Sequence, residues 1–306
     1  MRVTDSLMSR SFLRNLSANT ENVMKYQNQL STLKEVSKPS DDPLKVSKIL
    51  DLNNSIIQND QYKKTINDAI QWTNVQDSAL SSATKSLQRI KTLIQYSANG
   101  TLSSEDRQAN KAEIESEIQG VVDAFNTNFG GRYVFAGKNT TEKPFEVTSV
   151  DGEITGITYS GTAEGNGNLS REIAPGVSVE LNTDGRNFMN AQNADGSDDL
   201  GTFFSEVLTA LDEDDTGKLS SLLDRADQEI ENVVSNRSKT GSIFNRLNAT
   251  LERNDSEKLN LKTMLSENQD IDLAEKYMQF TMEKSAYQAS LSMGTQILQT
   301  SILDYL

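Results

Sequence analysis

The sequence contains no histidine and no cysteine among its 306 residues. These absences exclude serine–histidine and cysteine–histidine nucleophiles, zinc sites built from either residue, and haem ligation by histidine. They also exclude disulfides, so cysteine usage does not indicate a redox compartment. Carboxylate chemistry and oxygen ligands for Ca²⁺ or Mg²⁺ remain open.

Apolar and aromatic residues are also scarce, at 35% and 6% of the chain, whereas charged residues make up 24%. This composition is poor for a compact globule and typical of narrow helical bundles. The formal net charge of −14 disfavours binding to nucleic acid or to an anionic membrane. No apolar run is long enough to span a membrane, and the amino end lacks the apolar core of a conventional secretory signal. We therefore expect no nucleic-acid partner and no membrane partner.

Apolar residues recur at heptad spacing in both terminal segments. In the first segment they are Phe12, Leu16, Val23, Tyr26, Leu30 and Leu33. In the last segment they are Leu273, Tyr277, Phe280, Tyr287, Leu291, Leu298 and Tyr305, followed by the terminal Leu306. Steps of three and four residues predict helices that each bury one narrow stripe against another helix.

Two interpretations of these stripes are open. Basic residues outnumber acids in residues 1–38, and acids outnumber bases in residues 270–306, so the two ends are expected to attract one another and to meet. The stripes could then form an intramolecular hairpin coil. We favour interfaces with other subunits, because a monomer has few ways to cover both apolar ends.

Two of the four prolines, Pro39 and Pro43, enclose an acidic pair in "KPSDDP". Pro39 is predicted to end the first helix, and Ser40 to cap the next one. Asp41 and Asp42 would then lie in its first turn, and Pro43 would give up an N–H that has no helical partner. The alternative is a two-carboxylate metal or catalytic site, but no third ligand or base lies nearby. We interpret the stretch as a break between helices, and expect no catalytic, cofactor or metal residue in the chain.

The middle of the chain predicts further helices. No proline or glycine interrupts residues 44–99, which predicts one helix of about 80 Å at 1.5 Å per residue. A third helix is predicted from about Ser103 to about Asn128, and helix returns near Gly201. "DEDDTGK" (212–218) lacks the closing glutamate of a calcium loop, so we interpret it as a solvated turn between helices.

Residues 133–190 differ, with short runs of β-branched and aromatic residues. Asp151-Gly152, between two such runs, is a two-residue hairpin signal. The glycines of "SGTAEGNGNLS" (160–170) are interpreted as a hairpin loop, because no Gly-Lys-Ser/Thr follows to make a phosphate cradle.

The expected fold class is mainly α: an elongated bundle of long helices with terminal coiled-coil arms and a small inserted β-rich domain. The predicted segments are an N-terminal arm (1–38), the first half of a helical core (39–132), the insert (133–199), the second half of the core (200–269) and a C-terminal arm (270–306).

Several motifs, in order, resemble the bacterial flagellin superfamily. In the amino-terminal half they are "KPSDDP" (38–43), "NDAIQWTNVQDSAL" (67–80), "SANGTLSSEDR" (97–107) and "GGRYVFAG" (130–137). In the carboxy-terminal half they are "FNRLNATLE" (244–252), "DIDLAEKYMQFTMEKSAYQASL" (270–291) and "SILDYL" (301–306). The resemblance covers the chain outside the β-rich insert. It departs from the family's pattern at Leu33, where glycine is common, and at Ile243, where arginine often stands.

The opening "MRVTDSLM", the stretch "QNQLSTLKEVSKPSDDP" and the ending "LDYL" are similar to the member of the superfamily that joins the flagellar hook to the filament. The alternative is flagellin, the filament subunit itself. In either case the resemblance implies a structural subunit rather than an enzyme.

The resemblance also implies a location and partners. The chain would be secreted unfolded through the flagellar export apparatus and would act outside the cell, at the hook–filament junction. Its implied partners are copies of itself in a ring or helical layer, the first hook-associated protein, flagellin, and an export chaperone at the C-terminal arm. The assembly interface is expected on the two heptad stripes.

Overall fold

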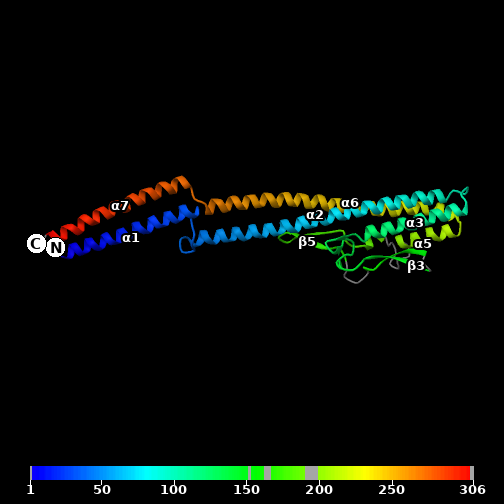
Figure 1. The fold of residues 1–306 in the computed structure, drawn as a ribbon, viewed down its shortest axis with the longest axis horizontal. Helices are drawn as coiled ribbons and strands as arrows, with labels where there is room; N and C mark the ends of the chain where they lie inside the picture. Colours follow the sequence, from blue (N-terminus) through cyan, green and yellow to red (C-terminus); the bar gives the residue numbers. More distant parts are fainter. Residues whose placement is uncertain (1, 151–152, 162–166, 190–198, 304–306) are drawn as a thin grey trace. The chain divides into compact units, whose positions relative to one another are not determined.

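The described residues form seven helices in the computed structural model, which covers residues 2–150, 153–161, 167–189 and 199–303 (Figure 1). The helices are α1 (Arg2–Thr32), α2 (Pro43–Ser97), α3 (Ser104–Phe125), α4 (Arg186–Met189), α5 (Leu200–Asp212), α6 (Thr216–Gln269) and α7 (Leu273–Leu303). The strands are β1 (Asn128–Phe129), β2 (Arg132–Tyr133), β3 (Phe145–Val150), β4 (Glu153–Tyr159), β5 (Ser170–Ala174) and β6 (Val177–Glu180). The predicted mainly α fold with a small β-rich insert is confirmed.

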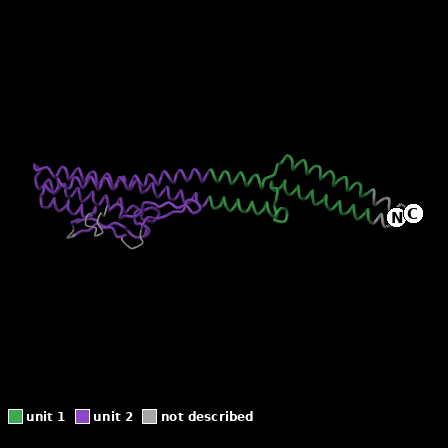
Figure 2. The backbone as a smooth tube through the Cα atoms, turned by 180° about the vertical axis from the view of Figure 1, so that it is seen from behind, with its two compact units in different colours: residues 1–59, 256–306 green, residues 60–255 purple. Residues whose placement is uncertain are grey.

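The chain divides into two compact units (Figure 2). Unit 1 consists of residues 1–59 and 256–306, and unit 2 consists of residues 60–255. Both boundaries fall inside long helices, α2 and α6, so each of these helices contributes to both units. The division into five segments stays a prediction.

In unit 2, α2 runs antiparallel to α3 and to α6, because residue numbers fall along one helix as they rise along its partner. Exposed ion pairs mark this direction, although each contributes little to the free energy of unfolding. The contacts are Arg89–Glu113 and Ser97–Asn110 with α3, and Lys63–Asp255, Asp77–Arg237 and Lys91–Asp227 with α6.

Unit 2 has an apolar core to which the helices and the insert both contribute. Phe125 of α3 is fully buried, and its ring centre lies 5.0 Å from that of Phe145 in β3 and 5.8 Å from that of Phe188 in α4. Ring pairs at such separations add stabilisation beyond the area that they bury. Because α3, β3 and α4 meet at one ring, the insert is packed as part of unit 2.

The insert contains two separate hairpins. β3 pairs with β4, and Val150 lies opposite Glu153, so a two-residue connection joins them as predicted. Asp151 and Gly152 themselves lie outside the described residues. β5 pairs with β6, and neither strand pairs with β3 or β4 in the described structure. The two strands on either side of "SGTAEGNGNLS", β4 and β5, do not pair with one another in the described structure, so the predicted hairpin between them is not found; residues 162–166 themselves lie outside the described residues.

Two contacts fix the β3–β4 hairpin on the helices. Asn126, which caps the end of α3, donates from Nδ2 to the carbonyl oxygen of Phe145 (2.9 Å) and accepts the Phe145 N–H at Oδ1 (3.0 Å). At the start of α5, Gly201 lies against β4, where a Cβ would collide with the carbonyl oxygen of Ile157. Close backbone approach therefore requires glycine at this position.

Three acids of "DEDDTGK" lie between α5 and α6, as predicted, and the first, Asp212, is the last residue of α5. Two ion pairs with α3 hold this turn, and the lysine of one of these pairs also reaches β4. Arg107 Nε lies 2.7 Å from Asp214 Oδ1, and Lys111 Nζ lies 2.7 Å from Asp212 and 3.1 Å from Glu153. The Arg107 hydrogen bond, with one from Ser104, holds the pKa of Asp214 below its usual value. Burial opposes the charged form of Lys111, yet its hydrogen bonds to Asp212 and Glu153 raise its pKa.

Candidate assembly interface

In unit 1, α1 and α7 form an antiparallel pair (Figure 1). Asn19 Nδ2 donates to Ser290 Oγ at 2.9 Å. Farther along, Phe12 packs against Gly294, where a Cβ would overlap its ring. The prediction that the two ends of the chain meet is confirmed, and the intramolecular hairpin coil is the arrangement found in the single chain.

The stripe predicted on α1 faces α7. Phe12, Leu16, Val23 and Leu30 are half-buried, whereas most positions between them are exposed. Leu33 does not continue the stripe, because it lies beyond the end of the helix and is 53% exposed.

On α7 the side that faces α1, which we call the seam, is more polar than predicted. Half-buried or buried residues recur along it at steps of four and three, namely Lys276, Phe280, Glu283, Tyr287, Ser290 and Gly294; Gln279 and Thr281 are half-buried outside this series. Phe280 and Tyr287 are the predicted residues found there. Small and polar seam residues leave room for the large side chains of α1, as Gly294 does for Phe12.

Other members of the predicted α7 stripe point away from the seam. Leu273, Tyr277 and Leu291 are 58%, 61% and 42% exposed. They share one helix face, because steps of four and fourteen residues are close to whole turns. We call these three residues the tyrosine strip. Leu298 lies in α7 beyond the residues whose side chains are described, and Leu306 lies outside the described residues.

A second apolar strip lies outside the seam, on the opposite flank of α7 from the tyrosine strip. Met278, Met282 and Met293, the methionine strip, are all more than half exposed. Four of the 31 residues of α7 are charged, and two of these four, Lys276 and Glu283, lie in the seam. A helix that is apolar on most of its sides is typical of a helix covered on several sides. The spacing of the apolar residues alone therefore did not distinguish the side of α7 that faces α1 from the sides that are exposed.

At the base of this pair, the chain connections on the two sides are bonded to one another. The Glu35 N–H donates to the Gln269 carbonyl oxygen (2.8 Å), and the Ile271 N–H donates to the Leu33 carbonyl oxygen (3.3 Å). We call residues 33–42 and 270–272 the joint. Both helix breaks therefore occur at the same level.

Leu33 ends α1 through its backbone conformation. Its φ of 57° lies in the left-handed region that favours glycine, and Thr32 is the last helical residue. The prediction that Pro39 ends this helix is wrong. Pro39 instead lies in a turn in which the Asp41 N–H donates to the Lys38 carbonyl oxygen at 3.0 Å.

Asp42 caps α2, and the predictions that Ser40 is the cap and that the acidic pair lies in the first turn are wrong. Asp42 Oδ1 accepts the Lys45 N–H at 3.0 Å, and Pro43 is the first helical residue. Proline favours the first helical position, so Pro43 already indicated that the cap is the residue before it, Asp42. Asp41 Oδ2 accepts the Lys38 N–H at 3.2 Å, so both carboxylates are bonded to backbone groups at a break between helices.

Glu35 lies at the centre of the joint. Its carboxylate pairs with Lys45 of α2 and lies 4.0 Å from Lys276 of α7, and its carbonyl oxygen accepts a hydrogen bond from Gln29 Nε2. The hydrogen bond from Lys45 lowers the pKa of Glu35. Burial opposes this shift, and the charges of Lys276 and Lys25 reinforce it.

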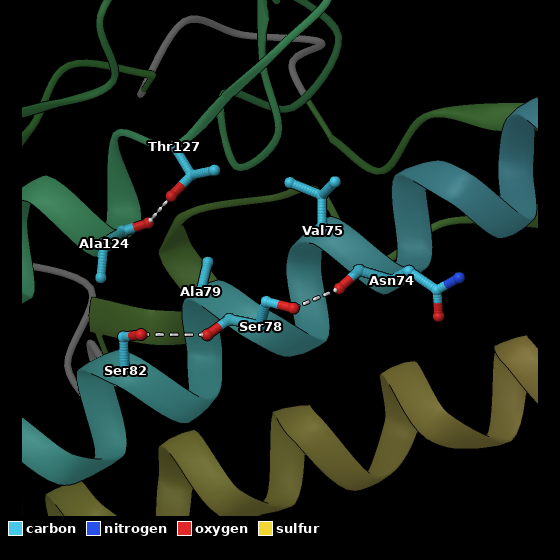
Figure 3. A pocket seen from close by; sticks show the side chains of 7 residues that line it. All are labelled: Asn74, Val75, Ser78, Ala79, Ser82, Ala124 and Thr127. Atoms are coloured by element: carbon cyan, nitrogen blue, oxygen red, sulfur yellow. Dashed lines mark hydrogen bonds between the residues drawn. The ribbon is translucent and has the colours of Figure 1, made fainter.

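Unit 2 offers a groove of about 350 Å³, shown in Figure 3. It is lined by Asn74, Val75, Ser78, Ala79, Ser82, Ala124 and Thr127. The hydroxyls of Ser78, Ser82 and Thr127 donate to carbonyl oxygens three or four residues earlier, so they are already bonded within the helices. Within the described part of the chain, no three acidic side chains are placed to hold a metal ion, and no helix is both long and apolar enough to cross a bilayer.

Two family models match the chain on either side of the insert. The bacterial flagellin N-terminal helical region matches residues 3–140, and the C-terminal helical region matches residues 223–306. The chain belongs to the bacterial flagellin family. These matches include α1 and α7, so the pair that carries the exposed apolar strips is part of the flagellin-family region.

Proteins of the flagellum match nearly the whole length of the chain. Flagellar hook-associated protein 3 of Escherichia coli (strain K12) is 28% identical over 326 residues, which cover 99% of this chain and 98% of that protein. Flagellin of Bacillus subtilis (strain 168) is 25% identical over 312 residues, covering 98% and 97%. The structure of a putative flagellar hook-associated protein from Vibrio parahaemolyticus, 19% identical, has a TM-score of 0.64 and covers 75% of this chain and 100% of that chain.

Proposed function

We propose that this flagellin-family chain is a structural subunit that joins the flagellar hook to the filament. The proposal rests mainly on the surface of α7. Two of the four charged residues of this helix lie in the seam, and two apolar strips are exposed. Such a helix needs further protein surfaces to cover it. Full-length similarity to a protein named hook-associated protein 3 supports the junction as the place of assembly.

The subunit contacts that we propose lie on the tyrosine and methionine strips. The α1 stripe supports these contacts by holding α1 against α7, through Phe12, Leu16, Val23 and Leu30. We propose Leu298 and Leu306 as further residues of the assembly interface. Methionine suits such surfaces, because its flexible side chain adapts to different neighbours. A junction subunit meets a different neighbour on each of its two sides, so this adaptability is useful.

The partners that we propose are copies of the chain in a ring or helical layer, the first hook-associated protein on the hook side, and flagellin on the filament side. Before assembly, an export chaperone would cover α7, whose exposed strips favour aggregation in a free subunit. The chain would be secreted unfolded and would act outside the cell. Its role would be structural rather than catalytic.

Electron microscopy of cells that lack the gene tests the proposal, together with an immunoblot for flagellin in the medium. A junction subunit predicts hooks without filaments and flagellin shed as monomer. Normal filaments on these cells would contradict the proposal.

The second candidate function is flagellin itself, which full-length similarity to the Bacillus subtilis protein favours. The same deletion strain separates the two. If the chain is the filament subunit, the deletion removes it from both cells and medium, and no separate flagellin is shed as monomer. Reintroduction of the gene should restore filaments in either case.

A pair of substitutions tests the proposed interface. Met282→Glu places a charge on the methionine strip, and we expect a folded monomer that does not restore filaments in the deletion strain. Ser178→Glu is the matched control, because it adds the same charge at an exposed position of the insert. Equal restoration by both variants would remove the methionine strip from the interface.

A further inference from the structure

Glu35 is bonded to all four helices that meet at the joint. Its carboxylate pairs with Lys45 of α2 and Lys276 of α7. Its N–H donates to the carbonyl oxygen of Gln269, the last residue of α6, and its carbonyl oxygen accepts from Gln29 of α1. One residue of a connecting segment thus links α1, α2, α6 and α7 within unit 1.

The backbone hydrogen bonds of the joint do not by themselves set the angle at which the α1–α7 pair leaves unit 1's portions of α2 and α6. One bond ties Glu35 to the last residue of α6, and the other ties Ile271 to Leu33, so the α1–α7 pair can still rotate about these two points. Such a movement is opposed by any residue of the joint that contacts both a helix of the α1–α7 pair and a helix on the other side of the joint. The carboxylate of Glu35 makes such contacts, to α2 through Lys45 and to α7 through Lys276.

We propose that Glu35 is an electrostatic latch: its ionised carboxylate fixes the angle between the α1–α7 pair and unit 1's portions of α2 and α6, and loss of its charge lets the pair swing about the joint. This inference goes beyond the proposed function, because it concerns a single subunit before any assembly. The inference does not depend on whether the partner of the subunit is a hook protein or flagellin.

The charges around the latch explain why it should open. Lys45 of α2, Lys276 of α7 and Lys25 of α1 act on the one carboxylate from three helices. From α6 the contact is the backbone carbonyl of Gln269, and Asp270 just beyond accepts a hydrogen bond from Ser266 Oγ. Without the charge of Glu35, three ammonium groups repel one another across the joint. The same removal of charge occurs when Glu35 is protonated.

The test measures distances in the isolated full-length chain. Because the sequence contains no cysteine, two introduced cysteines direct spin labels to chosen positions. Labels at Ser17→Cys of α1 and Asn54→Cys of α2, both exposed, span the joint, and labels at Asn54→Cys and Thr263→Cys of α6 do not. Pulsed electron paramagnetic resonance gives the distribution of each distance.

Glu35→Gln, which removes the charge at nearly constant shape, should broaden the distance distribution across the joint about twofold. The Asn54–Thr263 distribution should not change. Lys45→Met should produce the same broadening from the other side of the ion pair. Glu21→Gln is the matched control, because it removes an exposed acid from α1 and should leave both distributions unchanged.

Acid should act on the parent chain as the substitution does. As the pH falls through the lowered pKa of Glu35, the parent distribution should broaden, whereas that of Glu35→Gln should change little further. An unchanged distribution in Glu35→Gln, or equal broadening in Glu21→Gln, overturns the latch. Loss of helical circular dichroism in both Glu35→Gln and Lys45→Met also overturns it, because Glu35 would then maintain the helices rather than their angle.

Discussion

The two units of this chain bury their apolar residues to very different extents. In unit 2, rings such as Phe125, Phe135 and Phe145 are completely buried. In the described part of unit 1, the buried hydrophobic side chains are Ile49 and Leu52, which keep 7% and 8% of their surface exposed, although α1 and α7 carry many other apolar residues. Unit 2 thus has the core of an independently stable fold, whereas unit 1 has apolar surfaces that neighbours can still cover.

The largest expected effect breaks the core of unit 2. Phe125→Ala should lower the free energy of unfolding by about 3–5 kcal/mol, because it removes a ring on which three elements meet. Urea unfolding followed by the fluorescence of Trp72, the single tryptophan, measures this loss in unit 2. Met282→Ala in unit 1 should change it by less than about 0.5 kcal/mol. Similar losses in both variants would contradict the contrast between the units.

The next effect concerns the contact between α5 and β4. Gly201→Ala should cost about 1–3 kcal/mol, because its Cβ meets the carbonyl oxygen of Ile157. Gly241→Ala, in a helical position of α6 with open space around its Cα, should instead stabilise unit 2 by about 0.5–1 kcal/mol. Thermal unfolding of the two variants gives both signs. A stabilised Gly201→Ala would show that the two backbones can separate without cost.

A smaller change sharpens the comparison from the side of unit 1. Leu33→Gly should stabilise the end of α1 by about 0.5–1 kcal/mol, because glycine adopts a φ of 57° without the strain that a leucine suffers there. Hydrogen exchange of amides in the last turn of α1 measures this gain. Faster exchange in the variant would mean that the greater freedom of glycine in the unfolded chain outweighs the relief of strain.

The smallest effect is the response to acid. Glu35 in unit 1 and Asp214 in unit 2 both have a lowered pKa in the folded chain, from ordinary values of 4.5 and 3.8. Each therefore stabilises the fold above its ordinary pKa, and this contribution is lost as the pH falls through the lower folded value. Exposure to solvent keeps both contributions small. Unfolding as a function of pH should show a weaker acid loss in Asp214→Asn than in the parent chain, and an identical loss would contradict the role of Arg107.

Periodicity predicted the long helices well, because burial of a stripe at 3.6 residues per turn is a strong and repeated constraint. Periodicity did not identify the seam of α7, because the large side chains of α1 determine which residues can lie opposite them. Phe12 requires a residue without a side chain opposite, and a search for apolar spacing passes over Gly294. The exposed strips of α7 are more apolar than its seam, so the sequence pointed to Leu273, Tyr277 and Leu291 instead.

The joint was predicted only in outline. "KPSDDP" indicated a break, but the helix before it ends at Leu33 through a backbone conformation that a leucine seldom signals. Pro43 was enough to place the cap at Asp42, because proline favours the first helical position. Other possible caps nearby, such as Ser40 and Asp41, made this position harder to recognise. The convergence of four helices on Glu35 depends on tertiary contacts between distant segments, which no local pattern of residues encodes.

The paired hydrogen bonds between Asn126 and Phe145 have an evolutionary consequence. They anchor the first strand of the hairpin at the point where the chain leaves α3, and Gly201 fixes the same hairpin where α5 begins. Between β4 and α5, insertions and deletions outside β5, β6 and α4 can therefore accumulate without shifting the helices, because the attachment points stay fixed. Related chains can thus differ in the length of these connections while they keep a common framework.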